Sequence, residues 1–297
     1  MPKPNTTTSA QITLEVKELD FISRFTSNWQ ALIEILGIMR PVRKDPGTKL
    51  VASKATVELQ DGNVAEGAEV PFSQAKVEPV LFEDLSLEKF RKAVTAESVA
   101  KFGAAVAVQK TDDAFLNELQ GTVLDRFYAF AQTGTLTSEE ATFQMAVSMA
   151  VTRVKDKFKK MRKNYENVVA FVNTIDVGKY LGSANISVQN KNGIEYLKDF
   201  LGASTVIITS EIPEGKVIAI PADNIILYYI DPSDGDFEEL GLFYTVDGET
   251  NLIGIHKEGN YGRVMGETHA LMGLKLFAEF IDAIAVITIN PAVAAGE

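Results

Sequence analysis

The sequence predicts an α+β fold, in which helical and extended segments are segregated along the chain instead of strictly alternating. Apolar residues recur at helical spacing in two long stretches, residues 111–134 and 143–161. After Asn164 the pattern changes to short apolar runs separated by turn residues, which is typical of strands. The chain has 297 residues, of which 46% are hydrophobic, so it can bury the core of one large domain or two ordinary ones.

The first 44 residues are predicted to form an arm. Residues 1–18 are polar and rich in threonine, whereas the apolar residues from Leu19 to Leu36, including Trp29, follow helical spacing until Gly37. An amphipathic helix behind a polar segment needs a surface that covers its apolar face. We therefore expect it to fold back on its own chain or to dock on a neighbour.

Residues 45–80 predict a long β-hairpin. The sequence alternates between Thr48 and Leu59, passes through the turn cluster Gln60-Asp61-Gly62-Asn63 and continues in extended form to Val77. The hairpin has few large apolar residues, and an isolated two-stranded hairpin is only marginally stable in water. We therefore expect it to find its partner on another subunit.

Helical periodicity returns between residues 81 and 134. Ser86 is predicted to cap a short helix that extends to Val94, and a second helix is predicted from about Thr95. The longest helix covers residues 111–134 and ends at Gly134.

Both long helices have candidate N-caps. Thr111 or Asp112 is predicted to cap the first helix. Thr137 and Glu140 form a capping-box pattern before the second helix, residues 143–161.

The remainder of the chain is predicted to consist mainly of strands. Short helices are expected at residues 175–181 and 191–201, and the alternation over residues 269–277 favours a strand. The other predicted strands are Val168–Val172, Ser204–Thr209, Lys216–Ile220, Asn224–Ile230, Leu242–Val246, Asn251–Ile255 and Ala283–Ile289.

Composition excludes several kinds of chemistry. The chain has no cysteine, which rules out disulfides, thiolate zinc sites, iron–sulfur clusters and cysteine nucleophiles. Its net charge of −11 argues against binding of nucleic acid or anionic membranes as the main task. The absence of a secretion signal and of a long apolar run favours a soluble protein in a cytoplasm.

Motifs for catalysis are also missing. His256 and His269 lie outside any zinc-binding spacing, and the chain has no nucleophile elbow, phosphate-binding loop or dinucleotide-binding loop. We therefore expect no catalytic residue, no cofactor and no metal ligand, and we interpret both histidines as surface or interface residues.

Two charged segments remain as candidates. The acidic segment 231–240 lacks the regular oxygen spacing of a calcium loop, so a solvated acidic turn is favoured. The basic segment 153–163 has seven basic residues and one acidic residue, which fits a solvated helix face or contact with an acidic partner. The candidate residues of this basic face are Arg153, Lys157, Lys159, Lys160 and Lys163.

The order of these parts resembles the major capsid proteins of tailed bacteriophages, which have the Hong Kong 97-type capsid fold. VELQDGNVAEGAEVPFSQAKVEP resembles the extension loop of that family, and TDDAFLNELQGTVLDRFYAFAQTGT resembles its long spine helix. VVAFVNTIDVGKYLG and FLGASTVIITSEIPEGKVIAIPADNIILYYI resemble segments of its axial domain. ETHALMGLKLFAEFIDAIAVITI resembles the closing strands of its peripheral domain.

The resemblance implies a shell-forming protein without a catalytic site. It divides the chain into an N-terminal arm (1–44), an extension loop (45–80), a peripheral domain (81–136 and 241–297) and an axial domain (137–240). The implied partners are other copies of the chain in hexamers and pentamers, a separate scaffolding protein, a portal and the enclosed double-stranded DNA, with no membrane. The implied location is the virion, after assembly in the host cytoplasm. The candidate intersubunit contacts are Trp29, Asp61, Gly62, Glu66, Gly67 and Glu69.

Two alternatives stay open. An encapsulin-like compartment shares the fold but encloses cargo enzymes instead of DNA. A carboxylate-dependent or calcium-binding enzyme would use the acidic residues between Asp231 and Glu239.

Overall fold

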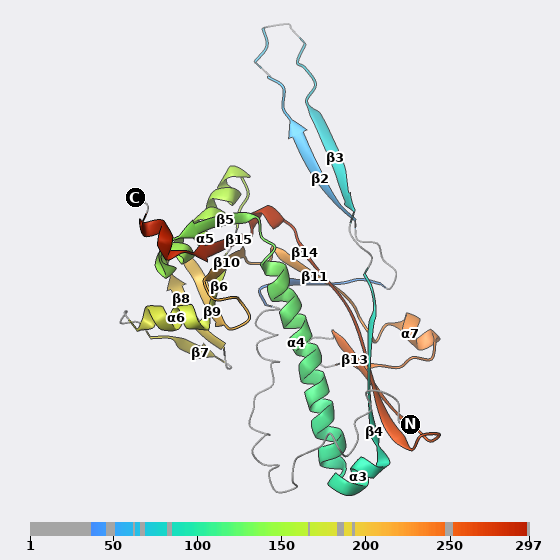
Figure 1. Ribbon diagram of the computed structural model, residues 1–297. Helices are drawn as coiled ribbons and strands as arrows, with labels where there is room; N and C mark the ends of the chain where they lie inside the picture. Colours follow the sequence, from blue (N-terminus) through green and yellow to red (C-terminus); the bar gives the residue numbers. More distant parts are fainter. Residues whose placement is uncertain are drawn as a thin grey trace.

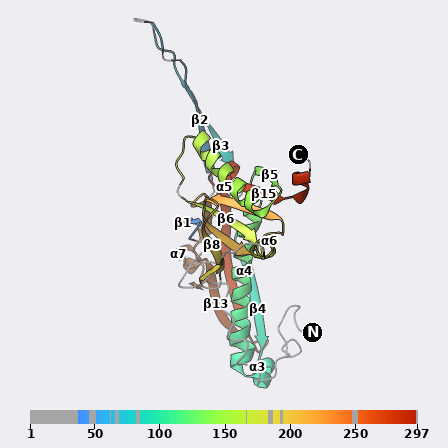
Figure 2. The same cartoon turned by 90° about the vertical axis from the view of Figure 1, so that its left-hand side faces the viewer.

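The computed structural model describes residues 37–45, 51–61, 63–65, 69–81, 85–165, 167–182, 187–191, 194–246 and 252–295. The predicted helix of the N-terminal arm lies outside these ranges. The described chain forms a six-stranded sheet, a seven-stranded sheet and a two-stranded hairpin that projects away from both of them (Figures 1 and 2). The α+β class predicted from the sequence is confirmed.

The long helix α4 (Thr111–Ala131) lies alongside the strands of the six-stranded sheet (Figure 1). It follows α3 (Ala96–Phe102) and a π-helical turn, η2 (Ala105–Lys110). The six-stranded sheet has the order β1-β11-β14-β13-β12, and β4 also pairs with β14. Its strands are β1 (Arg40–Arg43), β4 (Glu88–Thr95), β11 (Ile225–Ile230), β12 (Thr245–Val246), β13 (Ile253–Asn260) and β14 (Met265–Ala278).

The seven-stranded sheet has the order β5-β15-β10-β6-β9-β8-β7. Helix α5 (Phe143–Lys160) packs on β10 and β15, and α6 (Thr174–Leu181) packs next to β6. The strands are β5 (Leu136–Glu140), β6 (Val168–Asn173), β7 (Gln189–Lys191), β8 (Ile194–Phe200), β9 (Ala203–Thr209), β10 (Lys216–Pro221) and β15 (Ala285–Ile289).

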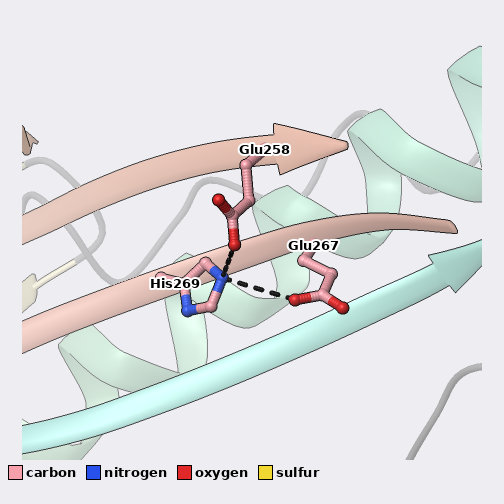
Figure 3. A group of neighbouring side chains, drawn as sticks. All are labelled: Glu258, Glu267 and His269. Atoms are coloured by element: carbon pink, nitrogen blue, oxygen red, sulfur yellow. Dashed lines mark hydrogen bonds and ion pairs between the residues drawn. The ribbon is translucent and has the colours of Figure 1, made fainter. Parts of the chain in front are cut away.

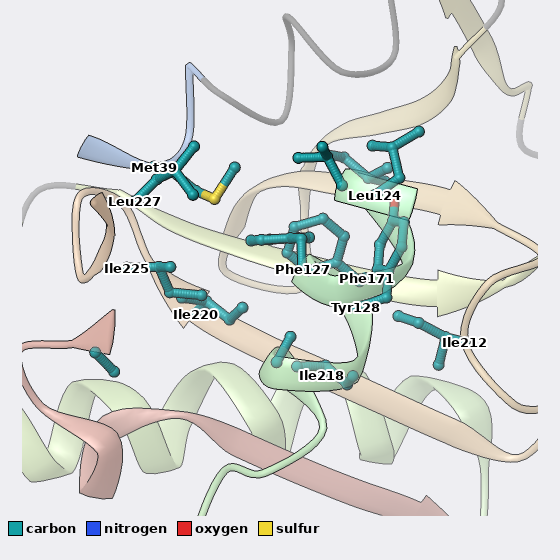
Figure 4. Packing of buried hydrophobic residues seen from close by; sticks show 14 of the residues in the cluster. Met39, Leu124, Phe127, Tyr128, Phe171, Ile212, Ile218, Ile220, Ile225 and Leu227 are labelled. Carbon is teal, nitrogen blue, oxygen red and sulfur yellow. The ribbon is translucent and has the colours of Figure 1, made fainter. Parts of the chain in front are cut away.

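The core of the molecule joins the two sheets at the end of α4. The rings of Phe127, Tyr128 and Phe171 meet edge to face, with centroids 5.3 to 5.9 Å apart (Figure 4). Strand β6 is buried on both faces: Phe171 faces this core, whereas Ala170 faces the core under α5. Strand β6 thus has apolar contacts on both sides, as is typical of a central strand.

Sheet membership does not follow the predicted domain boundaries. Strand β11 pairs in the six-stranded sheet, next to the closing strand β14, although it lies before residue 240. Strand β15 pairs in the seven-stranded sheet, although it lies after residue 241. The division into peripheral and axial domains itself stays a prediction.

Several predicted elements are wrong. The helix predicted from Ser86 to Val94 is strand β4, because β14 pairs with all eight of its residues and imposes the extended conformation. The helix predicted at 191–201 is the β7–β8 hairpin, in which Asn190 lies opposite Glu195. The strand predicted at Leu242–Val246 is reduced to the two residues of β12.

Both predicted N-caps are also wrong. Helix α4 continues from the π-helical turn, and the Thr111 hydroxyl donates to the Ala107 carbonyl oxygen at 2.7 Å instead of capping. Thr137 and Glu140 lie in β5, parallel to β15, so they are not available to α5. The Thr142 side chain caps α5 by accepting from the backbone N–H of Met145.

The predicted hairpin is confirmed, but its turn is not. Strands β2 (Val51–Glu58) and β3 (Gln74–Leu81) are antiparallel, with Val51 opposite Leu81 and Glu58 opposite Gln74. The pairing ends at Glu58 and Gln74, so residues 59–73 form the connection in place of a two-residue turn, and Gly62 of the predicted turn lies outside the described residues.

Candidate functional site

The projecting hairpin is the first candidate for an assembly surface. Among the described residues, β2 and β3 pair only with each other. Four large apolar side chains at the end of β2 and in the connection to β3 are strongly exposed: Val57 (59%), Leu59 (82%), Val70 (59%) and Phe72 (91%). Monomeric proteins do not usually leave several large apolar side chains together in water, so these residues are candidates for a contact with another chain.

The predicted intersubunit contacts fall partly on this hairpin. The Asp61 side chain accepts a hydrogen bond from the Asn63 backbone at 2.9 Å, and Glu69 is exposed. Trp29, Gly62, Glu66 and Gly67 lie outside the described residues. These exposed apolar residues were not predicted as contacts, because the low number of apolar residues in the hairpin does not indicate which of them lack a partner.

An ion-pair cluster holds the chain segment that precedes the hairpin. Strand β1 adds to the edge of β11 in parallel, and Arg43 contacts Asp231 at 3.2 Å and Asp234 at 2.8 Å. The hydrogen bond from Arg43 holds the pKa of Asp234 below its ordinary value. Asp234 also caps the short helix α7 (Gly235–Glu239).

The acidic segment is therefore not simply a solvated turn. The side chains of Asp231 and Asp234 are 13% and 14% exposed and balance the charge of Arg43. The chain uses these two carboxylates to hold the segment that leads into the hairpin, which was not predicted because Arg43 lies about 190 residues earlier.

Much of the basic face of α5 is balanced within the chain. Lys157 pairs with Asp282 at 2.7 Å, and Lys160 pairs with Asp156 at 2.6 Å. The Lys163 ammonium lies 4.1 Å from the centre of the Phe280 ring. Arg153 is half-buried and Lys159 is exposed. The predicted acidic partner of this face stays a prediction.

An acidic anchor joins α4 to the six-stranded sheet. Asp112 pairs with Lys92 of β4 at 2.5 Å and with Lys257 of β13 at 2.7 Å, and it accepts a hydrogen bond from Thr268 at 3.0 Å. Burial alone would raise the pKa of Asp112, but hydrogen bonds from the two lysines outweigh it and lower this pKa below its ordinary value.

A cluster of titratable side chains lies on the β13–β14 hairpin. His269 Nε2 is 3.1 Å from Glu258 Oε1 and 3.6 Å from Glu267 Oε2 (Figure 3). Arg91 of β4 pairs with Glu267, and Asn260 donates to it at 2.9 Å. The signal for this cluster was the mirrored order His256-x-Glu258 and Glu267-x-His269, which the sequence analysis did not use.

No protein-family model matches the sequence, and no curated protein sequence matches it either. The fold does match solved structures. A chain of the Cyanophage A-1(L) capsid asymmetric unit has 12% identity and a TM-score of 0.60, and the match covers 98% of each chain. A chain from Mycobacterium phage Patience has 10% identity and a TM-score of 0.60, with 98% of this chain and 94% of the other covered.

A third structure agrees. A chain of the mature capsid of bacteriophage PhiM1 has 6% identity and a TM-score of 0.59, with 86% of each chain covered. The chain has a phage capsid fold. This capsid fold extends over nearly the whole chain in the two longest matches, so the resemblance of separate segments reflects one common architecture. In the part of the chain that the structure describes, no helix is long and apolar enough to cross a membrane.

Proposed function

We propose that this protein is a major capsid protein that assembles into hexamers and pentamers of an icosahedral shell around double-stranded DNA. The observation that carries the proposal is the β2–β3 hairpin, which extends from a phage capsid fold and exposes large apolar side chains such as Phe72. Its role is structural and not catalytic. The location that follows is the virion, after assembly in the host cytoplasm.

Repeated contacts between identical copies supply the physical basis. In a closed symmetric shell, each subunit presents the same hairpin to the next subunit, so a modest gain per contact is multiplied over the shell. The net charge of −11 is consistent with a container for DNA, because a strongly basic wall would bind phosphate tightly and hinder filling. A separate scaffolding protein and a portal are the further partners that we propose.

The test is assembly of the purified full chain. We expect rings or shells in the ultracentrifuge and in negative-stain micrographs, because the hairpin has no other partner among the described residues. A variant in which Asn-Gly replaces residues 59–73 would join Glu58 directly to Gln74 by a two-residue turn and keep both strands. This variant should remain folded but fail to form shells.

Three outcomes would each contradict a part of the proposal. Shells that form equally well without residues 59–73 would remove the assembly role of the hairpin. A wild-type chain that stays monomeric at high concentration, with and without a co-expressed scaffolding protein, would remove the capsid function. Native particles that hold protein cargo instead of DNA would contradict the enclosed DNA.

A further inference from the structure

We propose that Glu258, Glu267 and His269 form a binding site for a divalent transition-metal ion, and that zinc is the ion that fits it best. The three ligand atoms lie within 4.8 Å of one another on the β13–β14 hairpin (Figure 3). This inference does not depend on the capsid function, because it rests on the geometry of one hairpin.

The distances suit a single ion. His269 Nε2 lies 3.1 Å from Glu258 Oε1 and 3.6 Å from Glu267 Oε2. Oxygen and nitrogen ligands at zinc distances of about 2.1 Å lie about 3.4 Å apart when they are arranged tetrahedrally. Small side-chain rotations are therefore enough to place an ion among the three atoms.

The strand register concentrates negative charge at this place. Glu258 lies directly opposite Glu267 in the antiparallel pair, and like charges in that arrangement repel each other. The Glu267 side chain is only 1% exposed, so water screens this repulsion poorly. Arg91 balances one carboxylate, and a bound cation would balance the other.

The buried ligand is held in place by groups outside the ligand set. Asn260 Nδ2 donates to Glu267 Oε1 at 2.9 Å, and Arg91 pairs with Oε2 of the same carboxylate. The Asn260 hydrogen bond is on Oε1, so it orients the carboxylate without occupying Oε2 and reduces the conformational freedom that the ligand loses on binding, which raises metal affinity.

The cluster is also accessible. The side chains of Glu258 and His269 are 53% and 27% exposed. An ion can therefore enter, and the fourth position is left for water or for a group of another chain.

The donor set selects the kind of ion. Imidazole nitrogen together with carboxylate oxygen suits zinc and its first-row neighbours. Calcium and magnesium take oxygen ligands almost exclusively and require more of them than this hairpin offers.

The experiment is a zinc titration of the full chain after treatment with a chelator. Calorimetry measures the binding, and thermal denaturation measures the change in melting temperature. We expect saturable binding of one ion per chain and a rise in melting temperature, because an ion that binds the folded state stabilises it. Cobalt used as a second probe should give visible absorption bands, which report nitrogen and oxygen ligands directly. An excess of calcium should not displace the zinc.

Matched variants locate the site. His269→Asn and Glu258→Gln should each weaken zinc binding by about tenfold or more. His256→Asn is the control, because His256 lies opposite His269 in the register but outside the cluster, and it should change the affinity by less than about twofold. Glu258→Gln alters a half-exposed side chain, so it tests the site even if His269→Asn disturbs folding.

The proposal is overturned if the wild-type chain shows no saturable zinc binding up to about 100 µM. It is equally overturned if His256→Asn weakens binding as much as His269→Asn, or if Glu258→Gln leaves both the affinity and the cobalt spectrum unchanged.

Discussion

Gly134 lies directly against Ile284: a Cβ atom on Gly134 would be 2.6 Å from the Ile284 carbonyl oxygen. The same carbonyl accepts a hydrogen bond from the Leu136 backbone at 3.1 Å. This close approach joins the segment after α4 to the segment before β15. Glycine is required at position 134 because a side chain has no space there. The sequence predicted Gly134 as the end of the helix, but α4 already ends at Ala131.

The first prediction follows from this contact. Gly134→Ala should lower the free energy of unfolding by about 2 kcal/mol, because the added methyl group overlaps backbone atoms that must move. Urea denaturation of the unassembled chain measures the change. Gly178→Ala is the control: Gly178 lies inside α6 with open space around it, so its replacement should raise stability by about 0.5 kcal/mol. Equal effects of the two variants would contradict the prediction.

The second prediction concerns the anchor at Asp112. Asp112→Asn should destabilise the chain by about 3 kcal/mol near neutral pH, because it removes the carboxylate that balances the charge of the nearly buried Lys92 ammonium. Asp113→Asn changes the exposed neighbouring carboxylate and should cost less than about 1 kcal/mol. Thermal or urea denaturation of both variants makes the comparison.

The pH dependence of the same variant is the third prediction. The pKa of Asp112 is lowered in the folded state, so its stabilising effect is complete above the ordinary value of 3.8 and is lost as the pH falls below it. Wild-type stability should therefore fall more steeply below about pH 4 than that of Asp112→Asn. Parallel acid-denaturation curves for the two proteins would show that Asp112 has no such role.

The fourth prediction concerns Tyr128 in the core. Burial raises the pKa of its hydroxyl to about 12, and Thr209 is its hydrogen-bond partner. Because the folded state favours the neutral phenol, its contribution is present below the ordinary pKa of 10.0 and is lost as the pH rises toward 12. Tyr128→Phe should lose about 1 kcal/mol at neutral pH but should resist alkaline unfolding better than the wild type. Equilibrium unfolding at a series of alkaline pH values measures both effects.

The fifth prediction concerns two exposed apolar side chains in the connection between β2 and β3. Replacing Leu59 and Phe72 together by serine should raise the protein concentration needed for assembly by tenfold or more, because each side chain would contribute about 2 kcal/mol when it is buried in a contact. The matched control keeps both positions apolar, with Leu59→Ile and Phe72→Leu, and should assemble nearly as well as the wild type. Light scattering over a concentration series separates the two variants. Equal assembly of the serine variant would show that these side chains face no partner.

Most of the elements predicted correctly from the sequence are those whose residues interact locally, although the β7–β8 hairpin, which is also local, was predicted to be a helix. Helices α4 and α5 have long apolar stripes, and helical spacing sustained over several turns does not fit the alternation of a strand. Strand β4 was mistaken for a helix because Phe90 and Val94 satisfy both helical and alternate spacing in so short a segment. The extended conformation of β4 is imposed by β14, which lies about 170 residues later and supplies the ladder of hydrogen bonds.

The candidate sites follow the same division. The hairpin was predictable because its two strands are near each other in the chain, whereas the pairing of Arg43 with Asp231 was not. The cluster around His269 was within reach, since β13 and β14 are adjacent and only their register had to be worked out. A prediction of register from the turn at 261–264 would have placed Glu258 opposite Glu267.

The position of β15 constrains when the molecule can finish folding. Of the seven strands in its sheet, β15 comes last in the chain, yet it lies between β5 and β10 in the interior. During synthesis, β5 has therefore no neighbour on that side until residues 285–289 leave the ribosome. Until then, the edges of β5 and β10 that β15 covers lack this strand partner, and unpaired strand edges make incompletely folded chains prone to aggregation. Under the proposed capsid function, a subunit could therefore assemble only after translation has passed this strand, which would keep unfinished chains out of the shell.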